Sequence, residues 1–281
     1  MGRTIREIFR IDSIGNPWFV RILFAFLAIL KCGVEVLPIC DTNFDEFFSW
    51  FNAVLNHPEV VTSIDIHTIP LTQGNIIYVV LSLFADFMLV VGGYIYMGVL
   101  IRKVRVKNNL PGAITRGKFF ARLLVLCCLT IILSLPLSFV LLYLSLIFII
   151  IFPCMIMLPA CYLSGDSSLF RSFSECIKKT KGYYLVNART ISIIVLINFV
   201  AEILMFALVD KAPMLVMVLS AFISIYSCLV LFRYVGIAYL RMVAVPGNRI
   251  LIRMQPMPIS EPETYSDDVR EVEDEDDQED K

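Results

Sequence analysis

The chain has 281 residues, of which 58% are hydrophobic, and its mean hydropathy is +0.78. That hydropathy is far above the range of water-soluble globular domains, so this class of protein is excluded. The formal net charge of −1 conceals a basic body and an acidic end. Ser260–Lys281 holds 12 acids and 2 bases, whereas the preceding residues hold 22 bases and 13 acids. This composition predicts an all-α, polytopic membrane helix bundle.

Residues 1–17 are predicted to be an amphipathic segment on the cytoplasmic side of the membrane. Its arginines alternate with isoleucine and phenylalanine, a pattern typical of a short helix that lies on a membrane surface. A first span is predicted from about Trp18 to Cys40, because this stretch is long and apolar enough to cross a bilayer.

The predicted outer loop, residues 41–74, has five acids and no Lys or Arg. Apolar residues recur in it at helical spacing, and Thr42 is placed to cap a helix there. We therefore predict an interfacial helix on the outer side of the membrane. Its apolar face consists of Phe44, Phe47, Phe48, Phe51 and Leu55.

A second span is predicted over about Ile76–Ile101, and the inner loop 102–122 follows with seven bases and no acid. The second half of that loop is amphipathic. The next 43 residues, Leu123–Gly165, contain no charge, amide or histidine, which is about twice what one span needs. We therefore predict a hairpin of two spans that turns near Ser134–Ser138, with kinks at Pro153 and Pro159 in the second.

The inner loop 164–189 contains a predicted amphipathic helix, which Asp166 or Ser167 can cap and Gly182 can end. A basic amphipathic helix of this kind is suited to lying flat at a membrane surface. Its apolar face consists of Leu169, Phe170, Phe173, Cys176 and Ile177. Its basic residues are candidate contacts to a lipid surface or a partner: Arg171, Lys178, Lys179 and Lys181.

The fifth and sixth spans are predicted over about Thr190–Val209 and Met214–Val243, which completes a membrane domain of residues 18–243. The inner segments carry 4, 7 and 5 bases, whereas the outer ones carry Lys211 alone. The positive-inside rule then predicts six spans in the cell membrane with both termini in the cytoplasm. Residues 244–281 are predicted to be a disordered acidic tail, either a tether for a basic partner or a shield for the protein's own basic loops.

Four ionisable residues interrupt the predicted spans at similar depth in the outer half of the bundle: Lys31, Glu35, Asp86 and Glu202. Each costs at least about 2.5–3.5 kcal/mol there unless it is paired or hydrated. One interpretation is a polar layer that holds a cation or relays a proton. The other is structural pairing, in which Lys31 bonds to Glu35 or Asp86, and Glu202 is protonated or bonds to Asn198. Arg233 is interpreted as snorkelling to the inner interface.

Patterns that would indicate catalysis or a cofactor are missing from the sequence. It has no Ser/His/Asp set, HExxH helix or phosphate-binding glycine loop. His57 and His67, with Glu59 and Asp65, have a spacing that fits no compact zinc site. The eight cysteines form no CxxC pair and are interpreted as small hydrophobic residues. We predict no catalytic residue, no metal, no cofactor and no nucleic-acid partner.

Residues 157–186, MLPACYLSGDSSLFRSFSECIKKTKGYYLV, resemble a segment of a broad bacterial membrane family. That family includes the membrane-spanning part of some glycerophosphodiester phosphodiesterases. Its pattern is a proline-containing span, a small polar turn, and a helix that is matched here by Ser172 or Ser174, Thr180, Lys181 and Gly182. The pair Gly92–Gly93 before a basic loop is also similar, so the resemblance covers about Gly92–Val209. It implies a six-helix membrane fold, and without a soluble phosphodiesterase domain it implies no enzymatic activity.

These features predict a non-enzymatic integral membrane accessory, assembly or regulatory protein. It would act through its helix bundle and its basic cytoplasmic surface, with the lipid bilayer, anionic lipids and a protein for the acidic tail as partners. The alternative is a small secondary transporter or permease subunit that uses the polar layer. Inverted internal repeats would favour transport, and the two halves of the sequence show none.

Overall fold

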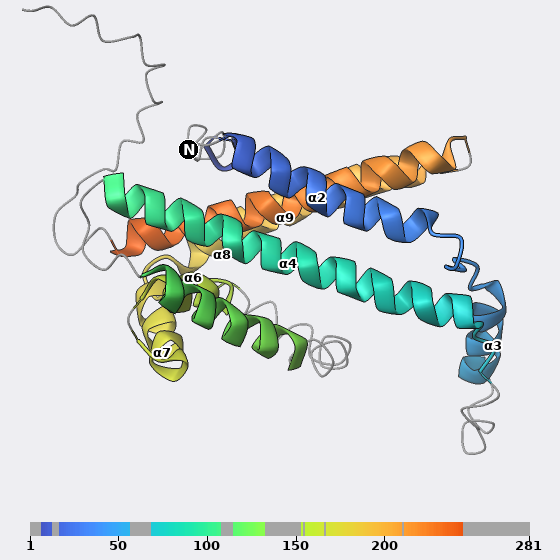
Figure 1. Cartoon of the computed structure of the whole chain (residues 1–281), viewed down its shortest axis with the longest axis horizontal. Helices are drawn as coiled ribbons and strands as arrows, with labels where there is room; N and C mark the ends of the chain where they lie inside the picture. Colours follow the sequence, from blue (N-terminus) through green and yellow to red (C-terminus); the bar gives the residue numbers. More distant parts are fainter. Residues whose placement is uncertain are drawn as a thin grey trace, which may run out of the picture. The chain divides into compact units, whose positions relative to one another are not determined.

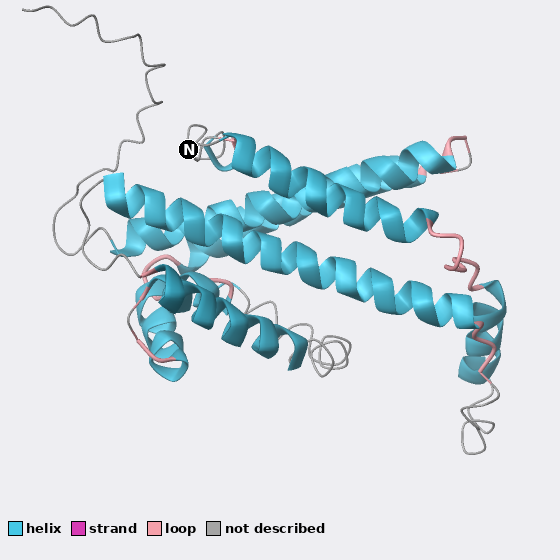
Figure 2. Cartoon of the chain, in the orientation of Figure 1, coloured by secondary structure: helices cyan, strands magenta, loops and turns pink. Residues whose placement is uncertain are grey.

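A computed structural model describes residues 7–12, 17–56, 69–107, 115–132, 153, 155–165, 167–209 and 211–243. All of these residues lie in the first of two units, Met1–Pro246 and Gly247–Lys281, into which the chain divides. Within these ranges the regular structure is helical, as predicted, and no strand is formed (Figure 2). The acidic tail and the predicted turn at Ser134–Ser138 lie outside the described residues.

Three long helices form the centre of the fold (Figure 1). α2 spans Pro17–Val36, α4 spans Gln73–Lys107 and α9 spans Pro213–Val243, and each packs against the other two. α8, Tyr184–Phe206, packs against α9. Their central side chains are almost fully buried: Leu27, Tyr96, Met97, Ile225, Leu229, Val230 and Val235. Lipid chains are as apolar as these side chains, so close van der Waals packing and not removal from water holds membrane-spanning helices together.

Two adjacent glycines bring α4 close to two different neighbours. A Cβ atom on Gly92 would lie 3.1 Å from a methyl carbon of Leu27 on α2. A Cβ atom on Gly93 would overlap the ring of Phe232 on α9. That ring also packs edge-on against Tyr94, with centroids 5.2 Å apart. The missing side chains therefore allow α2 and α9 to approach α4 on either side.

Three of the described helices, α4, α8 and α9, are long and apolar enough to cross a membrane. They coincide with the second, fifth and sixth predicted spans. The 35 residues of α4 extend over roughly 50 Å at about 1.5 Å per residue. Since a bilayer's hydrocarbon core is only about 30 Å thick, α4 is long enough to continue beyond it. Its basic end, through Lys107, lies in the predicted inner loop.

The predicted kink at Pro159 takes another form. α6 is a short helix, Leu158–Ser164, and Pro159 lies in its first turn. The first N–H groups of a helix have no intrahelical acceptor, so a proline is tolerated there. Pro159 therefore helps to start a helix where a bend was predicted. α6 packs against α4, α9 and the following helix, α7 (Leu169–Thr180).

Residues 7–12 pack against the helix bundle. Ile8 is only 1% exposed, and Arg233, which was predicted to snorkel, is 3% exposed. Arg233 Nη1 donates a hydrogen bond to the Tyr96 hydroxyl, 3.2 Å away. Three side chains each donate to a backbone carbonyl at 2.8 Å: Arg233 to Glu7, Tyr226 to Phe9, and Tyr96 to Ile11. The long helices thus bind the main chain of the N-terminal segment.

The outer loop contains the predicted helix, α3, which spans Asp45–Asn56. Its aromatic residues stack on one another, and Phe48 and Phe51 remain 57% and 43% exposed, as suits a helix at an interface. The first turn is capped by Asn43, not by the predicted Thr42. The Asn43 side-chain oxygen accepts the backbone N–H of Asp45 at 2.9 Å.

Asn75 joins the start of α3 to the start of α4. This side chain is 2% exposed, and its nitrogen donates to the carbonyls of Asp41 (2.8 Å) and Asn43 (2.9 Å). Its oxygen accepts both the backbone N–H and the hydroxyl of Thr72, at 3.0 and 2.8 Å. Both N–H groups and both acceptor positions of the Asn75 side-chain amide are therefore used within the protein.

Replacing Asn75 with leucine should release α3 from α4. The partly buried carbonyls of Asp41 and Asn43 would lose their donor, at about 0.5–1.5 kcal/mol each. Hydrogen–deuterium exchange of residues 45–56 should therefore become faster. Asn52→Leu, at an exposed position within α3, is the matched control and should leave this exchange unchanged. Equal exchange in both variants would show that the Asn75 amide does not hold the loop.

Candidate functional site

The polar residues of α2 and α4 form one cluster. Lys31 Nζ makes an ion pair and hydrogen bond with Asp86 Oδ1 across the two helices. One helical turn beyond Lys31, Glu35 accepts a hydrogen bond of 2.9 Å from the Tyr78 hydroxyl of α4. The Lys31 side chain is 26% exposed and that of Asp86 is 52% exposed. Three of the four predicted layer residues are thus brought together, each with a partner.

Glu202 belongs to a second cluster, between α8 and α9. The Asn198 amide nitrogen donates to Glu202 Oε1 at 2.8 Å, and the Ser227 hydroxyl donates to the Asn198 oxygen at 2.7 Å. Asn198 and Ser227 also border a largely apolar cavity of about 380 Å³. The bond between Asn198 and Glu202 is the one proposed in the structural interpretation of the sequence.

The two clusters adjoin the same turn of α9 without being joined. Ser227 faces the α8 cluster, and the neighbouring Cys228 thiol is 3.8 Å from the Leu89 carbonyl of α4. Among the described residues, no hydrogen bond or ion pair links Glu202 to Lys31 or Asp86. No group of three metal-ligating side chains occurs in those ranges either. Only the Lys31–Asp86 contact neutralises opposite charges, whereas Glu35 and Glu202 are hydrogen-bonded to neutral side chains.

The histidine group His57, Glu59, Asp65 and His67 lies outside the described residues. The cysteines within the described ranges are free thiols, and those of α6 and α7 are buried.

α7 is the amphipathic helix predicted for the inner loop, and its apolar side faces outward. Phe170 is 87% exposed, and Phe173 and Ile177 are 40% and 46% exposed. Its buried face is made of small residues, Ser172, Cys176 and Thr180, which are at most 2% exposed. Cys176 therefore does not share the exposed apolar face to which it was assigned. Ser168, not Asp166 or Ser167, occupies the N-cap position, and it makes no side-chain capping bond.

The basic residues of α7 divide into two kinds. Glu175 lies 3.5 Å from Arg171 and 3.2 Å from Lys179, each one turn away, so it offsets part of both charges. Lys178 and Lys181 are exposed and make no ion pair within the described part of the chain. The predicted contact surface therefore retains two fully unpaired cations.

A second group of cations surrounds the C-terminal end of α6. Arg105 of α4 donates to the Ser164 carbonyl at 2.7 Å and to the Tyr239 hydroxyl at 3.0 Å. Arg122, in the helix formed by residues 116–132, donates to the Tyr162 carbonyl at 2.8 Å and to the Gly165 carbonyl. A helix C-terminus attracts cations, because its last carbonyls are unpaired and carry partial negative charge. These two arginines are structural.

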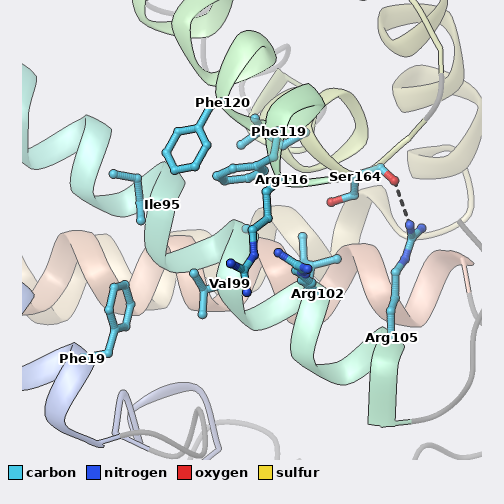
Figure 3. Close-up of a pocket in the computed structure, with 12 residues that line it drawn as sticks. Phe19, Ile95, Val99, Arg102, Arg105, Arg116, Phe119, Phe120 and Ser164 are labelled. Atoms are coloured by element: carbon cyan, nitrogen blue, oxygen red, sulfur yellow. Dashed lines mark hydrogen bonds between the residues drawn. The ribbon is translucent and has the colours of Figure 1, made fainter. Parts of the chain in front are cut away.

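Next to this contact lies a cavity of about 390 Å³ between α2, α4, α6 and the helix of residues 116–132 (Figure 3). Arg102 and Arg116 border it together with Arg105. No local sequence pattern predicts this site, because its residues come from four separated segments. One partial signal is present: the aromatic pair Phe119–Phe120 lies between basic residues in the amphipathic half of the loop.

No protein-family model, curated protein or solved structure matches the chain. The resemblance of about Gly92–Val209 to the bacterial six-helix family therefore stays a prediction. The placement of the charged residues is the guide to function.

Proposed function

We propose that the chain is a six-span protein of the cell membrane, with both termini in the cytoplasm, and that it is a non-enzymatic accessory, assembly or regulatory protein. The three long apolar helices and the outward-facing apolar side of α7 support this placement. The six-helix family resemblance implies the same architecture. Function would then be exerted through the basic inner side of the bundle.

One observation carries the proposal: the four charged residues of the predicted polar layer are partnered, whereas four basic residues of the predicted inner surface make no hydrogen bond or ion pair within the described part of the chain. Lys31 binds Asp86, Glu35 binds Tyr78, and Glu202 binds Asn198. A transport site needs polar groups that are available to a substrate. Here the available cations are at the predicted inner surface, namely Arg102, Arg116, Lys178 and Lys181.

The predicted orientation can be tested in a variant whose eight native cysteines are replaced by alanine. Asn56→Cys should react with a membrane-impermeant maleimide added to intact cells, because α3 is expected outside. Asn109→Cys should react only after the cells are permeabilised. Labelling of Asn109→Cys in intact cells would reverse the orientation and remove the basis for an inner contact surface.

Transport is the second candidate, and the partial exposure of the Lys31–Asp86 pair favours it. An ion pair that reaches the surface of a bundle can open to a substrate more easily than a buried one. In liposomes that contain the purified protein, the accessory proposal predicts no proton flux down an imposed pH gradient. A flux that Asp86→Asn and Glu202→Gln abolish, at unchanged thermal stability, would establish transport instead.

Asp86→Asn also has an expected effect on stability. Asp86→Asn removes the counter-charge of Lys31 but keeps a hydrogen-bonding side chain. The loss should be on the order of 1 kcal/mol, because polar contacts between membrane helices contribute about 0.6 kcal/mol on average and at most about 1.7 kcal/mol. Thermal unfolding in detergent measures it. A loss several times larger would mean that the pair is sequestered from solvent more completely than its exposure indicates.

A further inference from the structure

We infer that the cavity bordered by Arg102 and Arg116 binds one anionic phospholipid, with its phosphate at the two arginines and the start of an acyl chain against the apolar walls. This inference rests on the proposed inner location of the basic residues.

The walls of the cavity are suited to hydrocarbon. They are formed by Phe19 of α2, Ile95 and Val99 of α4, and Phe119 and Phe120 of the facing helix. A volume of about 390 Å³ lies within the range of small-molecule sites, roughly 300–1,000 Å³. It would hold part of one lipid, not a whole one. Figure 3 shows these side chains converging from different helices on one space.

The two arginines supply unpaired positive charge at the same space. Arg102 and Arg116 are exposed, come from different helices, and make no hydrogen bond or ion pair within the described part of the chain. Figure 3 shows both guanidinium groups directed into the cavity region in front of α4. None of the described residues that line the cavity is a carboxylate. Two like charges beside an apolar surface are unfavourable unless an anion offsets them.

Neither arginine is explained by the fold. Arg105, which lines the same cavity, is 6% exposed and binds Ser164 and Tyr239. Arg116 has no such partner and opens its helix. A cation in the first turn opposes the helix dipole, so helix stability would disfavour it. An anion bound at that end would interact favourably with both the dipole and the side chain.

The chemistry of the ligand follows from this combination. Guanidinium groups bind phosphate oxygens in paired hydrogen bonds, and the aromatic and aliphatic walls require an apolar portion. Free phosphate lacks that portion. The chain's own acidic end, Ser260–Lys281, offers negative charge but few apolar side chains. The end of a spanning helix at the cytoplasmic side is also where lipid phosphates lie.

Native mass spectrometry of the full chain in dodecyl maltoside tests the inference. With added phosphatidylglycerol, the wild-type chain should retain one lipid, whereas phosphatidylcholine or inorganic phosphate at equal concentration should bind far less. Arg102→Gln with Arg116→Gln should weaken phosphatidylglycerol binding by at least about tenfold. Lys103→Gln with Lys118→Gln removes two exposed cations from the same two helices that do not line the cavity, and it should leave phosphatidylglycerol binding unchanged.

Without lipid, the lysine variant should melt at the wild-type temperature. The arginine variant should melt at the same or a slightly higher temperature, because its two cations oppose each other and the helix dipole. Equal loss of binding in both would indicate general attraction to basic residues and overturn the site. Wild-type affinity in the arginine variant would overturn it as well. Binding in detergent does not depend on orientation in a cell. A failure here, with Asn109→Cys still protected in intact cells, would therefore refute the lipid site and leave the proposed placement standing.

Discussion

Arg233→Met is expected to release residues 7–12 from the helix bundle and to destabilise the chain by on the order of 3 kcal/mol. Methionine fills similar space but cannot donate to the Glu7 carbonyl or the Tyr96 hydroxyl. Removing a buried charged group while its partners remain leaves those partners unsatisfied, which costs more than replacing the whole set. Hydrogen–deuterium exchange of residues 7–12 and the melting temperature report the two effects.

Two further variants distinguish the contribution of the Arg233 guanidinium from that of the neighbouring hydrogen bond and of the positive charge. Tyr226→Phe removes one neutral hydrogen bond, to the Phe9 carbonyl, and should cost about 1 kcal/mol. Arg233→Lys retains the charge but not the planar donor group, so an intermediate loss is expected. If Arg233→Met leaves exchange of residues 7–12 at the wild-type rate, the segment is held by its apolar side chains alone.

Gly93→Val is expected to lower the melting temperature by several degrees. The new side chain would occupy the position of the Phe232 ring, and α4 and α9 would have to separate or the ring would have to rotate. Overpacking of this kind costs about 1–3 kcal/mol. Valine forms helices slightly better than glycine, which offsets a few tenths of a kcal/mol. Thermal unfolding in detergent measures the net effect.

Gly33→Val is the matched control, because no atom outside the local chain lies within 4 Å of a Cβ at that position in α2. It should be neutral or slightly stabilising. Phe232→Leu, added to Gly93→Val, should recover part of the loss by making room, even though it gives up the contact with Tyr94. Identical melting temperatures for the two valine variants would show that α4 and α9 are not in close contact at Gly93.

The helices themselves could be read from the sequence, because their signals are local. Apolar runs predicted α4, α8 and α9, and the spacing of Phe44, Phe47 and Phe51 predicted α3. α7 follows from the alternation of apolar and basic residues at helical spacing. Helix ends were less predictable: the basic residues after Ile101 favour an inner loop, but they also prolong α4 as a helix through Lys107.

The hydrogen-bond and ion-pair partners of individual side chains are harder to predict from the sequence, since they depend on how separate helices are aligned. Lys31 can meet Glu35 within its own helix or Asp86 on another, and only the packing of α2 on α4 selects Asp86. The bond between Arg233 and Glu7 joins residues 226 positions apart. No local pattern distinguishes that contact from snorkelling. The cavity at Arg102 and Arg116 likewise depends on how separate helices are aligned, so no local pattern predicts it.

The arginines at the end of α6 also affect how the protein responds to ionic strength. Arg105 is buried, and both it and Arg122 are bonded to carbonyl groups, while Arg171 and Lys179 share one carboxylate. The bonds to neutral carbonyls do not cancel the charges of Arg105 and Arg122, but they hold these side chains away from a membrane surface or partner. Fewer basic side chains can therefore form ion pairs there than a tally of basic residues implies. Salt screens exposed charges within about 10 Å at 0.1 M and affects enclosed ones much less. The affinity of the basic inner side for an anionic surface or partner should accordingly fall less steeply with added salt than it would if every Lys and Arg took part in binding.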